Sequence, residues 1–211
     1  LMRGAGSVVA KVLLKLNEVA RAGQTTAELN EIALQMTLEA GAEPLFKGVE
    51  HPAGKMPFPG AICSSVNEQV VHGIPSQDVY LKDGDILSVD FGVRLNGYCG
   101  DSAITIPIGQ ISSDNQRLID VTREVLDIAV RHCGPGVKWS RVAGEMQQHA
   151  KSAGFGVVTE YAGHGIGRDM HEPPRVPNFV SPDLLRNDFI LKPGMVVAIE
   201  PMINAGSSRV K

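Results

Sequence analysis

The sequence has few cysteines, no long hydrophobic run and little net charge. Its three cysteines are widely spaced and form no paired motif, which argues against a disulfide framework and favours a reducing compartment. No apolar run approaches the roughly 18 residues of a membrane span, and the N-terminal segment lacks the core of a signal peptide. The formal net charge of -3 favours neither nucleic acid nor membrane lipid as a partner. We therefore expect a cytoplasmic protein that binds no nucleic acid and no membrane.

The pattern of apolar residues predicts two pairs of helices, each followed by strands. With 211 residues, 43% of them apolar, the chain can bury a sizeable core. Apolar residues recur at helical spacing over 6–22, and Thr25 with Glu28 has the spacing of a capping box that starts a second helix. Ser113 introduces a third helix and Ser140 a fourth. This order of elements predicts an α+β fold.

The stretch over residues 82–103 reads as a β-hairpin. Apolar strands flank Asn96-Gly97, and this pair is a strong hairpin signal because both central residues of the favoured turn need positive φ. With that turn, Asp90 and Asp101 lie on neighbouring diagonals of one face. Two carboxylates that close repel each other unless a cation lies between them, so a divalent metal is the economical explanation. The alternatives are a pair of solvated acids, or a register slip that puts them on opposite faces.

An internal repeat relates two halves of the sequence. KDGDILSVD and KPGMVVAIE align without a gap and place Asp90 and Glu200 at the same step of an apolar strand. Each half also has a His-Gly-Ile at a strand end, at His72 and at His164. The repeat predicts a pseudo-twofold fold, with central antiparallel sheet and outer helices, in which matching strand ends build one central site. Chance recurrence of short strand motifs is the alternative. We predict a single catalytic domain, 1–211, with halves of about 1–110 and 111–211.

Four side chains that can bind a metal then stand on strands or strand ends: Asp90, Asp101, His164 and Glu200. Mixed carboxylate and imidazole ligands suit Mn, Co, Fe or Zn better than a thiolate site does. Carboxylates can also bridge two ions in sites that hydrolyse carbonyl compounds. A single acid on a strand is more often a satisfied polar group than a ligand, but four at related positions predict a metal site.

Asp90 and Asp101 with ten residues between them, GHGIGRDMHE over 163–172 and IEPM over 199–202 together resemble type I methionine aminopeptidase. The resemblance implies the so-called pita-bread fold and two divalent ions as cofactors. It implies that Asp90 chelates one ion, that Asp101 bridges both, and that the second ion is held by two further residues. These two are His164 and Glu200.

The resemblance also implies hydrolysis of the first peptide bond, which removes the initiator methionine from nascent polypeptides with a small second residue. His72 would contact the substrate amine, His171 would stabilise the oxyanion, and Glu200 would move a proton as well as bind metal. Three residues would wall an apolar pocket for the methionine side chain: Phe58, Cys63 and Met170. The histidines could instead be satisfied loop residues, and the pocket residues ordinary core.

The family has a fifth ligand, a second bridging glutamate on a strand beyond the position of Glu200, whereas the sequence ends at Lys211. We therefore expect the C-terminal strands to be missing from a chain that continues. Little room for a helical insertion lies between His171 and Glu200, which favours type I. The alternatives are a proline-specific aminopeptidase or dipeptidase of the same fold and a non-catalytic peptide-binding relative. We expect a monomer that acts on the N-termini of nascent peptides, with the ribosome as a place of encounter.

Overall fold

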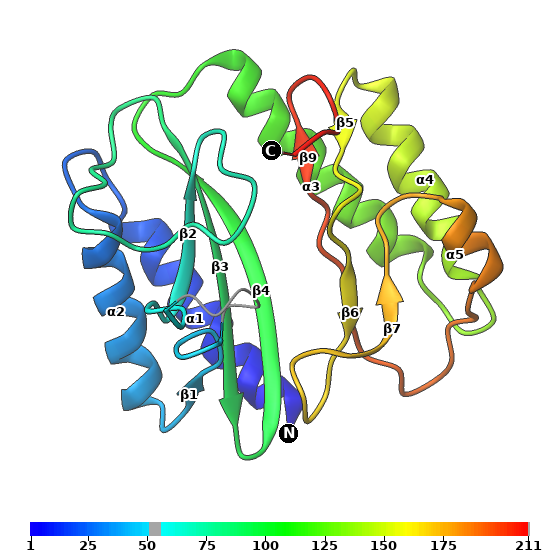
Figure 1. Ribbon diagram of the computed structural model, residues 1–211, viewed down its shortest axis with the longest axis horizontal. Coiled ribbons are helices and arrows are strands. Elements are labelled where there is room, and N and C mark those ends of the chain that lie inside the picture. The colour runs from blue at the N-terminus through cyan, green and yellow to red at the C-terminus, as the bar shows by residue number, and fades with distance from the viewer. Residues whose placement is uncertain (51–55, 211) are drawn as a thin grey trace. The chain divides into compact units, whose positions relative to one another are not determined.

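The computed structural model describes residues 1–50 and 56–210, which form two compact units (Figure 1). Unit 1 comprises Leu1–Ser112 and Gly167–Met170, and unit 2 comprises Ser113–Ile166 and His171–Lys211. Each unit has its own hydrophobic core. Among the described residues, no helix has the length and apolar character that crossing a membrane requires. The single catalytic domain stays a prediction.

Unit 1 packs two helices against a four-stranded antiparallel sheet. The helices are α1 (Met2–Val19) and α2 (Thr26–Glu39). The strands are β1 (Glu43–Pro44), β2 (Ile62–Val66), β3 (Ile86–Leu95) and β4 (Tyr98–Pro107). They run in the order β1-β3-β2, and β4 also pairs with β3. Apolar residues of α1, among them Val12 and Leu16, are buried with Leu87 and Phe91 of β3.

The helix boundaries follow local signals. The predicted capping box is present at the start of α2, where Thr25 accepts a hydrogen bond from Glu28 N and Glu28 accepts one from Thr25 N. The first helix lies at Met2–Val19 and so starts and ends earlier than the predicted 6–22. It ends because Ala20 takes an extended conformation, with φ -64° and ψ 126°.

The predicted hairpin is confirmed in its turn and in its register. Asn96 and Gly97 have φ values of 52° and 77°, as the two-residue turn requires. Asp90 pairs with Ala103, and Asp101 pairs with Gly92. Because direct partners share a face and side chains alternate along each strand, Asp90 and Asp101 lie on the same face of the hairpin.

Unit 2 combines three helices with short strands. The helices are α3 (Ser113–His132), α4 (Trp139–Ser152) and α5 (Pro182–Arg186). The strands are β5 (Gly156–Val157), β6 (Gly163–Gly165), β7 (Glu172–Val176), β8 (Val197–Ala198) and β9 (Ile203–Asn204). They form the pair β5-β9 and the sheet β7-β6-β8, both antiparallel. The helix α5 was not predicted, although Ser181 as its cap and Pro182 at its start are recognisable signals.

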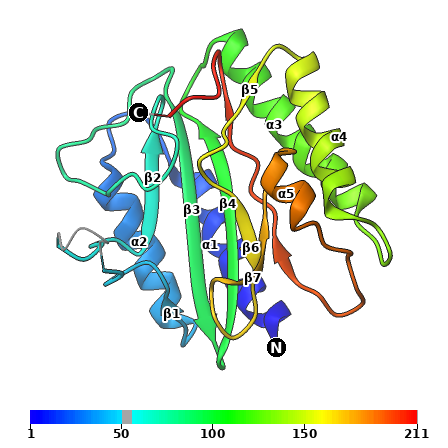
Figure 2. The same ribbon diagram turned by 45° about the vertical axis from the view of Figure 1, so that its right-hand side comes forward.

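The repeated segments have matching local structure. In both, a glycine with positive φ forms the turn, Gly84 at 94° and Gly194 at 85°. In both, the third residue after a lysine donates its N–H to that lysine's carbonyl, over 3.1 Å in the first segment and 3.2 Å in the second. The strands that follow differ, since β3, the long strand labelled in Figure 2, has ten residues and β8 has only two. The predicted strand over 195–203 is therefore wrong in its extent, and Glu200 lies between β8 and β9.

Candidate metal centre

Two of the predicted ligands, Asp90 and Asp101, lie in unit 1 on the hairpin of β3 and β4. Cys63 of β2 pairs directly with Asp90. Burial raises the pKa of the Cys63 thiol, and the negative charges of Asp90 and Asp101 raise this pKa further. A buried thiol that feels both carboxylates stays protonated near neutral pH, so Cys63 is suited to lining a pocket and not to nucleophilic attack.

The other two predicted ligands, His164 and Glu200, lie in unit 2. His164 is buried on β6, and its Nε2 lies 3.3 Å from Oε1 of Glu200. Its Nδ1 lies 2.8 Å from the carbonyl oxygen of Gly165. Because a carbonyl oxygen can only accept, Nδ1 donates this hydrogen bond, and Nε2 is the ring nitrogen that faces the Glu200 carboxylate. This is the arrangement of a metal-binding histidine, whose second nitrogen is oriented by a backbone carbonyl. The donor set of unit 2 therefore fits a divalent ion.

A buried amide holds the backbone next to this pair. Asn178 is 1% exposed, and its Nδ2 donates a hydrogen bond of 2.6 Å to the backbone carbonyl of Glu200. Its partner lies 22 residues away along the chain, and nothing in the surrounding Pro-Asn-Phe distinguishes it in the sequence. Asn178 is therefore a site residue that sequence reasoning missed.

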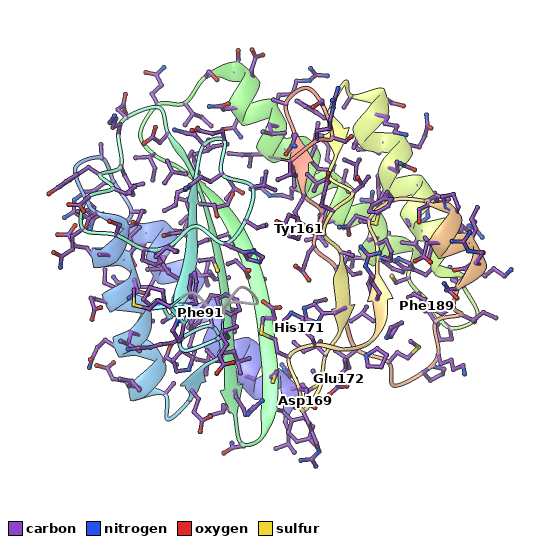
Figure 3. All side chains as sticks on the ribbon, in the orientation of Figure 1. Phe91, Tyr161, Asp169, His171, Glu172 and Phe189 are labelled. Carbon is purple, nitrogen blue, oxygen red and sulfur yellow. The ribbon has the colours of Figure 1, made fainter. Side chains whose placement is uncertain are left out.

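The two predicted catalytic histidines have different environments. The ring of His171, labelled in Figure 3, lies edge-on to that of His164, with centroids 4.3 Å apart and 64° between the planes, and both residues belong to unit 2. His72 belongs to unit 1 and has a φ of 60°, a conformation uncommon for a residue other than glycine. Loss of solvent around the ring lowers the pKa of His72 below its ordinary value, so the neutral ring predominates near pH 7.

The predicted pocket residues all belong to unit 1. Cys63 is buried on β2, whereas Phe58 and Met170 are half-buried in loops. Phe58 lies just before β2, where its N–H donates to the carbonyl of Val49 over 2.8 Å. Met170 ends the segment 167–170, which belongs to unit 1 although its neighbours in sequence belong to unit 2.

The segment 167–170 is fastened to the hairpin by contacts around Cys99. The backbone N–H of Cys99 donates to the carbonyl of Gly167 over 2.8 Å, and its thiol donates to the carbonyl of Arg168 over 3.3 Å. The guanidinium of Arg168 lies 4.8 Å from the centroid of the Tyr98 ring. The backbone that carries Met170 is thus held by β4, a role for Cys99 that its sequence context does not signal.

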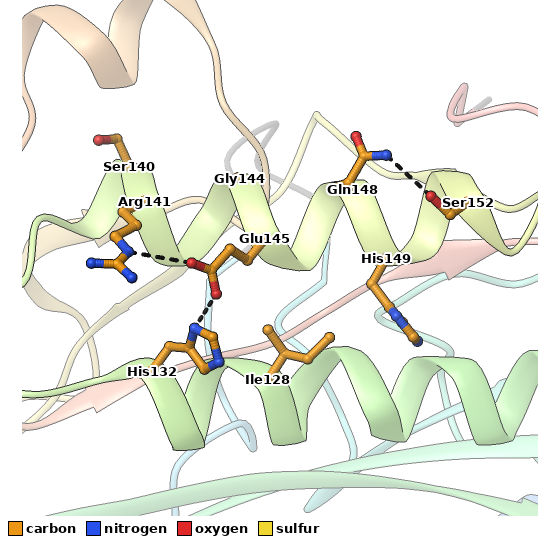
Figure 4. A pocket seen from close by; sticks show the side chains of 9 residues that line it. All are labelled: Ile128, His132, Ser140, Arg141, Gly144, Glu145, Gln148, His149 and Ser152. Atoms are coloured by element: carbon orange, nitrogen blue, oxygen red, sulfur yellow. Dashed lines mark hydrogen bonds and ion pairs between the residues drawn. The ribbon is translucent and has the colours of Figure 1, made fainter.

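A groove of about 550 Å³ lies elsewhere in unit 2, on the surface of α3 and α4 (Figure 4). Two histidine–glutamate pairs cross between these helices: His132 contacts Glu145, and Nε2 of His149 lies 2.7 Å from Oε2 of Glu124. None of the predicted site residues lines this groove. The groove is therefore separate from the residues considered for catalysis.

Comparisons with known proteins give consistent matches along the whole chain. The sequence matches the family described as metallopeptidase family M24 over residues 1–210. It is 46% identical over 211 residues to methionine aminopeptidase 1 of Bacillus subtilis, covering 100% of this chain and 81% of that protein. The crystal structure of methionine aminopeptidase from Thermotoga maritima has a TM-score of 0.91 at 38% identity, covering 100% of this chain and 81% of that one. Prolidase from Pyrococcus furiosus has a TM-score of 0.78 at 23% identity, covering 95% of this chain and 54% of that one.

Proposed function

The chain belongs to metallopeptidase family M24, and from that membership we propose that it removes the N-terminal methionine from polypeptides. The observation that carries this proposal is the 46% identity over the entire chain to a methionine aminopeptidase. The proline-specific alternative is represented by prolidase at 23% identity, a likeness that supports the shared pita-bread fold alone. The α+β prediction and the assignment as a metal-dependent aminopeptidase are confirmed.

We propose Asp90, Asp101, His164 and Glu200 as the residues that hold two divalent ions. Their carboxylates and imidazole suit Mn, Co, Fe or Zn, and the hydrogen bond from Nδ1 of His164 leaves Nε2 able to bind metal. Divalent ions at such ligands polarise a carbonyl and lower the pKa of water.

The remaining chemistry is assigned to the chain's own side chains. Glu200 accepts a proton from the attacking water at its carboxylate and gives it to the leaving amine. Asn178 holds the backbone of Glu200 through its hydrogen bond. A ring N–H of His171 donates to the developing oxyanion. His72, neutral because its pKa is lowered, accepts a hydrogen bond from the substrate's amino group. Three side chains receive the methionine side chain and exclude water from it: Phe58, Cys63 and Met170.

The substrate and the setting follow from the same family likeness. The substrate class is nascent polypeptides with a small second residue. The protein would act on them as a monomer in the cytoplasm, where it could meet them at the ribosome. All three cysteines are free, in keeping with a reducing compartment.

Peptide cleavage tests the proposal directly. The full chain, supplied with Mn²⁺ or Co²⁺, is expected to release methionine from Met-Ala-Ser and no alanine from Ala-Pro-Ala. Asp101→Asn should remove the activity, because it replaces a carboxylate ligand with a neutral amide. Release of alanine without methionine would instead establish the proline-specific alternative.

A further inference from the structure

The sheet β7-β6-β8 of unit 2 has one face on the core and one face away from it. Val176 is buried in the core, and Val197 packs against it. Because side chains alternate along a strand, the neighbouring Arg175 and Ala198 lie on the opposite face. His164 of β6 is in register with both of them. Arg175, His164 and Ala198 therefore share the face that points away from the core.

Arg175 lies on this face and has no ion-pair partner among the residues that the structure describes. Its side chain is exposed, and it forms no hydrogen bond or ion pair with any residue in the ranges 1–50 and 56–210. Glu200 follows β8 and contacts His164 at 3.3 Å, and β6 lies between β7 and β8. Within this sheet, His164 thus has Arg175 as its partner on β7 and Ala198 as its partner on β8, while the Glu200 carboxylate contacts its ring.

A guanidinium beside a metal-binding histidine needs a physical explanation. Its positive charge opposes the binding of a cation at His164, although exposure to water screens this repulsion. A guanidinium also keeps its charge at all working pH values and can form two parallel hydrogen bonds to one carboxylate. An anionic group of a bound substrate would offset the charge and use the donors.

We propose that Arg175 binds a carboxylate of the substrate on the C-terminal side of the cleaved bond. This inference rests on the proposed function, because the bond to be cleaved is placed at His164 and Glu200. Cross-strand neighbours are about 5 Å apart, so a long side chain at Arg175 reaches residues that closely follow the cleaved bond. The carboxylate can come from an acidic side chain or from the C-terminus of a short peptide.

Matched peptides separate these two sources. The first pair is Met-Ala-Glu-Gly amide and Met-Ala-Gln-Gly amide, which differ only in one side-chain charge. The second pair is Met-Ala-Ser with a free C-terminus and its amide. The wild-type protein is expected to favour the charged member of at least one pair by about three- to tenfold in kcat/KM, mainly through KM.

Variants of Arg175 then identify the residue responsible. Arg175→Gln should remove the preference for the charged peptide over its neutral counterpart, and Arg175→Glu should invert that preference. Arg123→Gln is the matched control, because Arg123 is an exposed arginine on α3, and it should keep the preference. Circular dichroism establishes that each variant is folded.

The outcomes distinguish this inference from the function on which it rests. Methionine release with no preference for either charged peptide, or with the same preference in Arg175→Gln, would overturn the role of Arg175 and leave the proposed function standing. Absence of methionine release from every peptide in the presence of metal would overturn both.

Discussion

A single buried amide, Asn178, holds the backbone of the proposed proton carrier. Asn178→Ala removes the amide that donates the 2.6 Å hydrogen bond to the backbone carbonyl of Glu200. That carbonyl then loses this hydrogen bond. We expect the free energy of unfolding to fall by about 1–3 kcal/mol, as measured by urea denaturation. We also expect metal affinity and kcat to fall at least tenfold, as removal of a residue that orients a ligand commonly does.

The control for this prediction is Asn187→Ala, which removes an exposed asparagine whose side chain donates a hydrogen bond to Asp183, one helix turn earlier. It should leave metal affinity and kcat unchanged. Loss of stability in Asn178→Ala with full metal affinity and full kcat would show that Asn178 acts on the fold alone and does not position Glu200.

At the level of single residues, the side chains proposed for metal binding can be recognised in the sequence, whereas the residues that hold them in place cannot. Asp101 and His164 stand out because few side chains can bind metal and their spacing is distinctive. Asn178 and Cys99 act through contacts that lie 22 and 69 residues away along the chain. Such contacts exist only after folding, so neither residue differs in sequence from an ordinary loop asparagine or a core cysteine.

Two glycines in unit 1 should respond oppositely to alanine, because a Cβ at Gly100 of β4 would meet the backbone of α1 whereas a Cβ at Gly6 of α1 would meet open space. A Cβ added at Gly100 would lie 2.7 Å from backbone atoms of Ala5 and Gly6, which cannot move without shifting α1. Gly100→Ala should lower the free energy of unfolding by about 1–3 kcal/mol. A Cβ at Gly6 would meet nothing within 4 Å, so Gly6→Ala should raise that free energy by about 0.5–1 kcal/mol.

Thermal unfolding of the two alanine variants checks this prediction in one experiment. The midpoint should fall for Gly100→Ala and rise for Gly6→Ala relative to the wild-type protein. Equal midpoints for the two variants would mean that α1 does not pack as closely on β4 as the structure indicates.

The start of α4 depends on an acid from a distant loop. Lys138 is the N-cap residue but makes no side-chain cap hydrogen bond, and Asp188 instead accepts hydrogen bonds from Ser140 N at 3.0 Å and Ser140 Oγ at 2.6 Å. Burial alone would raise the pKa of Asp188, but these hydrogen bonds, one from Phe189 N and the charge of Lys138 outweigh it and lower the pKa. Asp188→Ala should cost about 1–2 kcal/mol at neutral pH.

The pH dependence of this contribution has a defined sign. Because the pKa is lower in the folded state, the stabilisation is fully present above the unfolded value of about 3.9 and is lost as pH falls through the folded value. Urea denaturation at several pH values should therefore show that the difference in free energy of unfolding between wild type and Asp188→Ala becomes smaller at acidic pH. Asp127→Ala, at an exposed position of α3, is the control, and its free energy of unfolding should differ little from that of the wild type at every pH. If the free-energy difference between wild type and Asp188→Ala stays constant from neutral to acidic pH, the ionised carboxylate of Asp188 does not stabilise the start of α4.

At the level of elements, prediction succeeded where the signals are local. The turn at Asn96-Gly97 and the capping box at Thr25 are complete within four residues, and both are present. The strand expected over 195–203 is broken into β8 and β9, which pair with different partners, β6 and β5. Strand length depends on the partners available, and apolar pattern alone does not contain that information.

In the whole molecule, the two compact units each carry half of the proposed ligands. Asp90 and Asp101 belong to unit 1, whereas His164 and Glu200 belong to unit 2. The aligned repeat predicted this division because it places Asp90 and Glu200 at equivalent steps of the two halves. The proposed ligands thus come from a relation between halves that the sequence itself shows, whereas the backbone around Glu200 could not be predicted from it.

The proposed ligand assignment predicts that binding of metal stabilises the protein only when both Asp101 and His164 are intact. A ligand that binds the folded state alone adds about 2.7 kcal/mol to the free energy of unfolding at a concentration 100 times its Kd. Mn²⁺ should accordingly raise the Tm of the wild-type protein, and a chelator should reverse the rise. Asp101→Asn and His164→Gln should each remove most of this rise, because each takes away a proposed metal ligand.

His149→Gln provides the control, because His149 is an exposed histidine of unit 2 that pairs with Glu124. It should keep the full metal-dependent rise in Tm. A full rise in either Asp101→Asn or His164→Gln would contradict the assignment of that residue as a metal ligand.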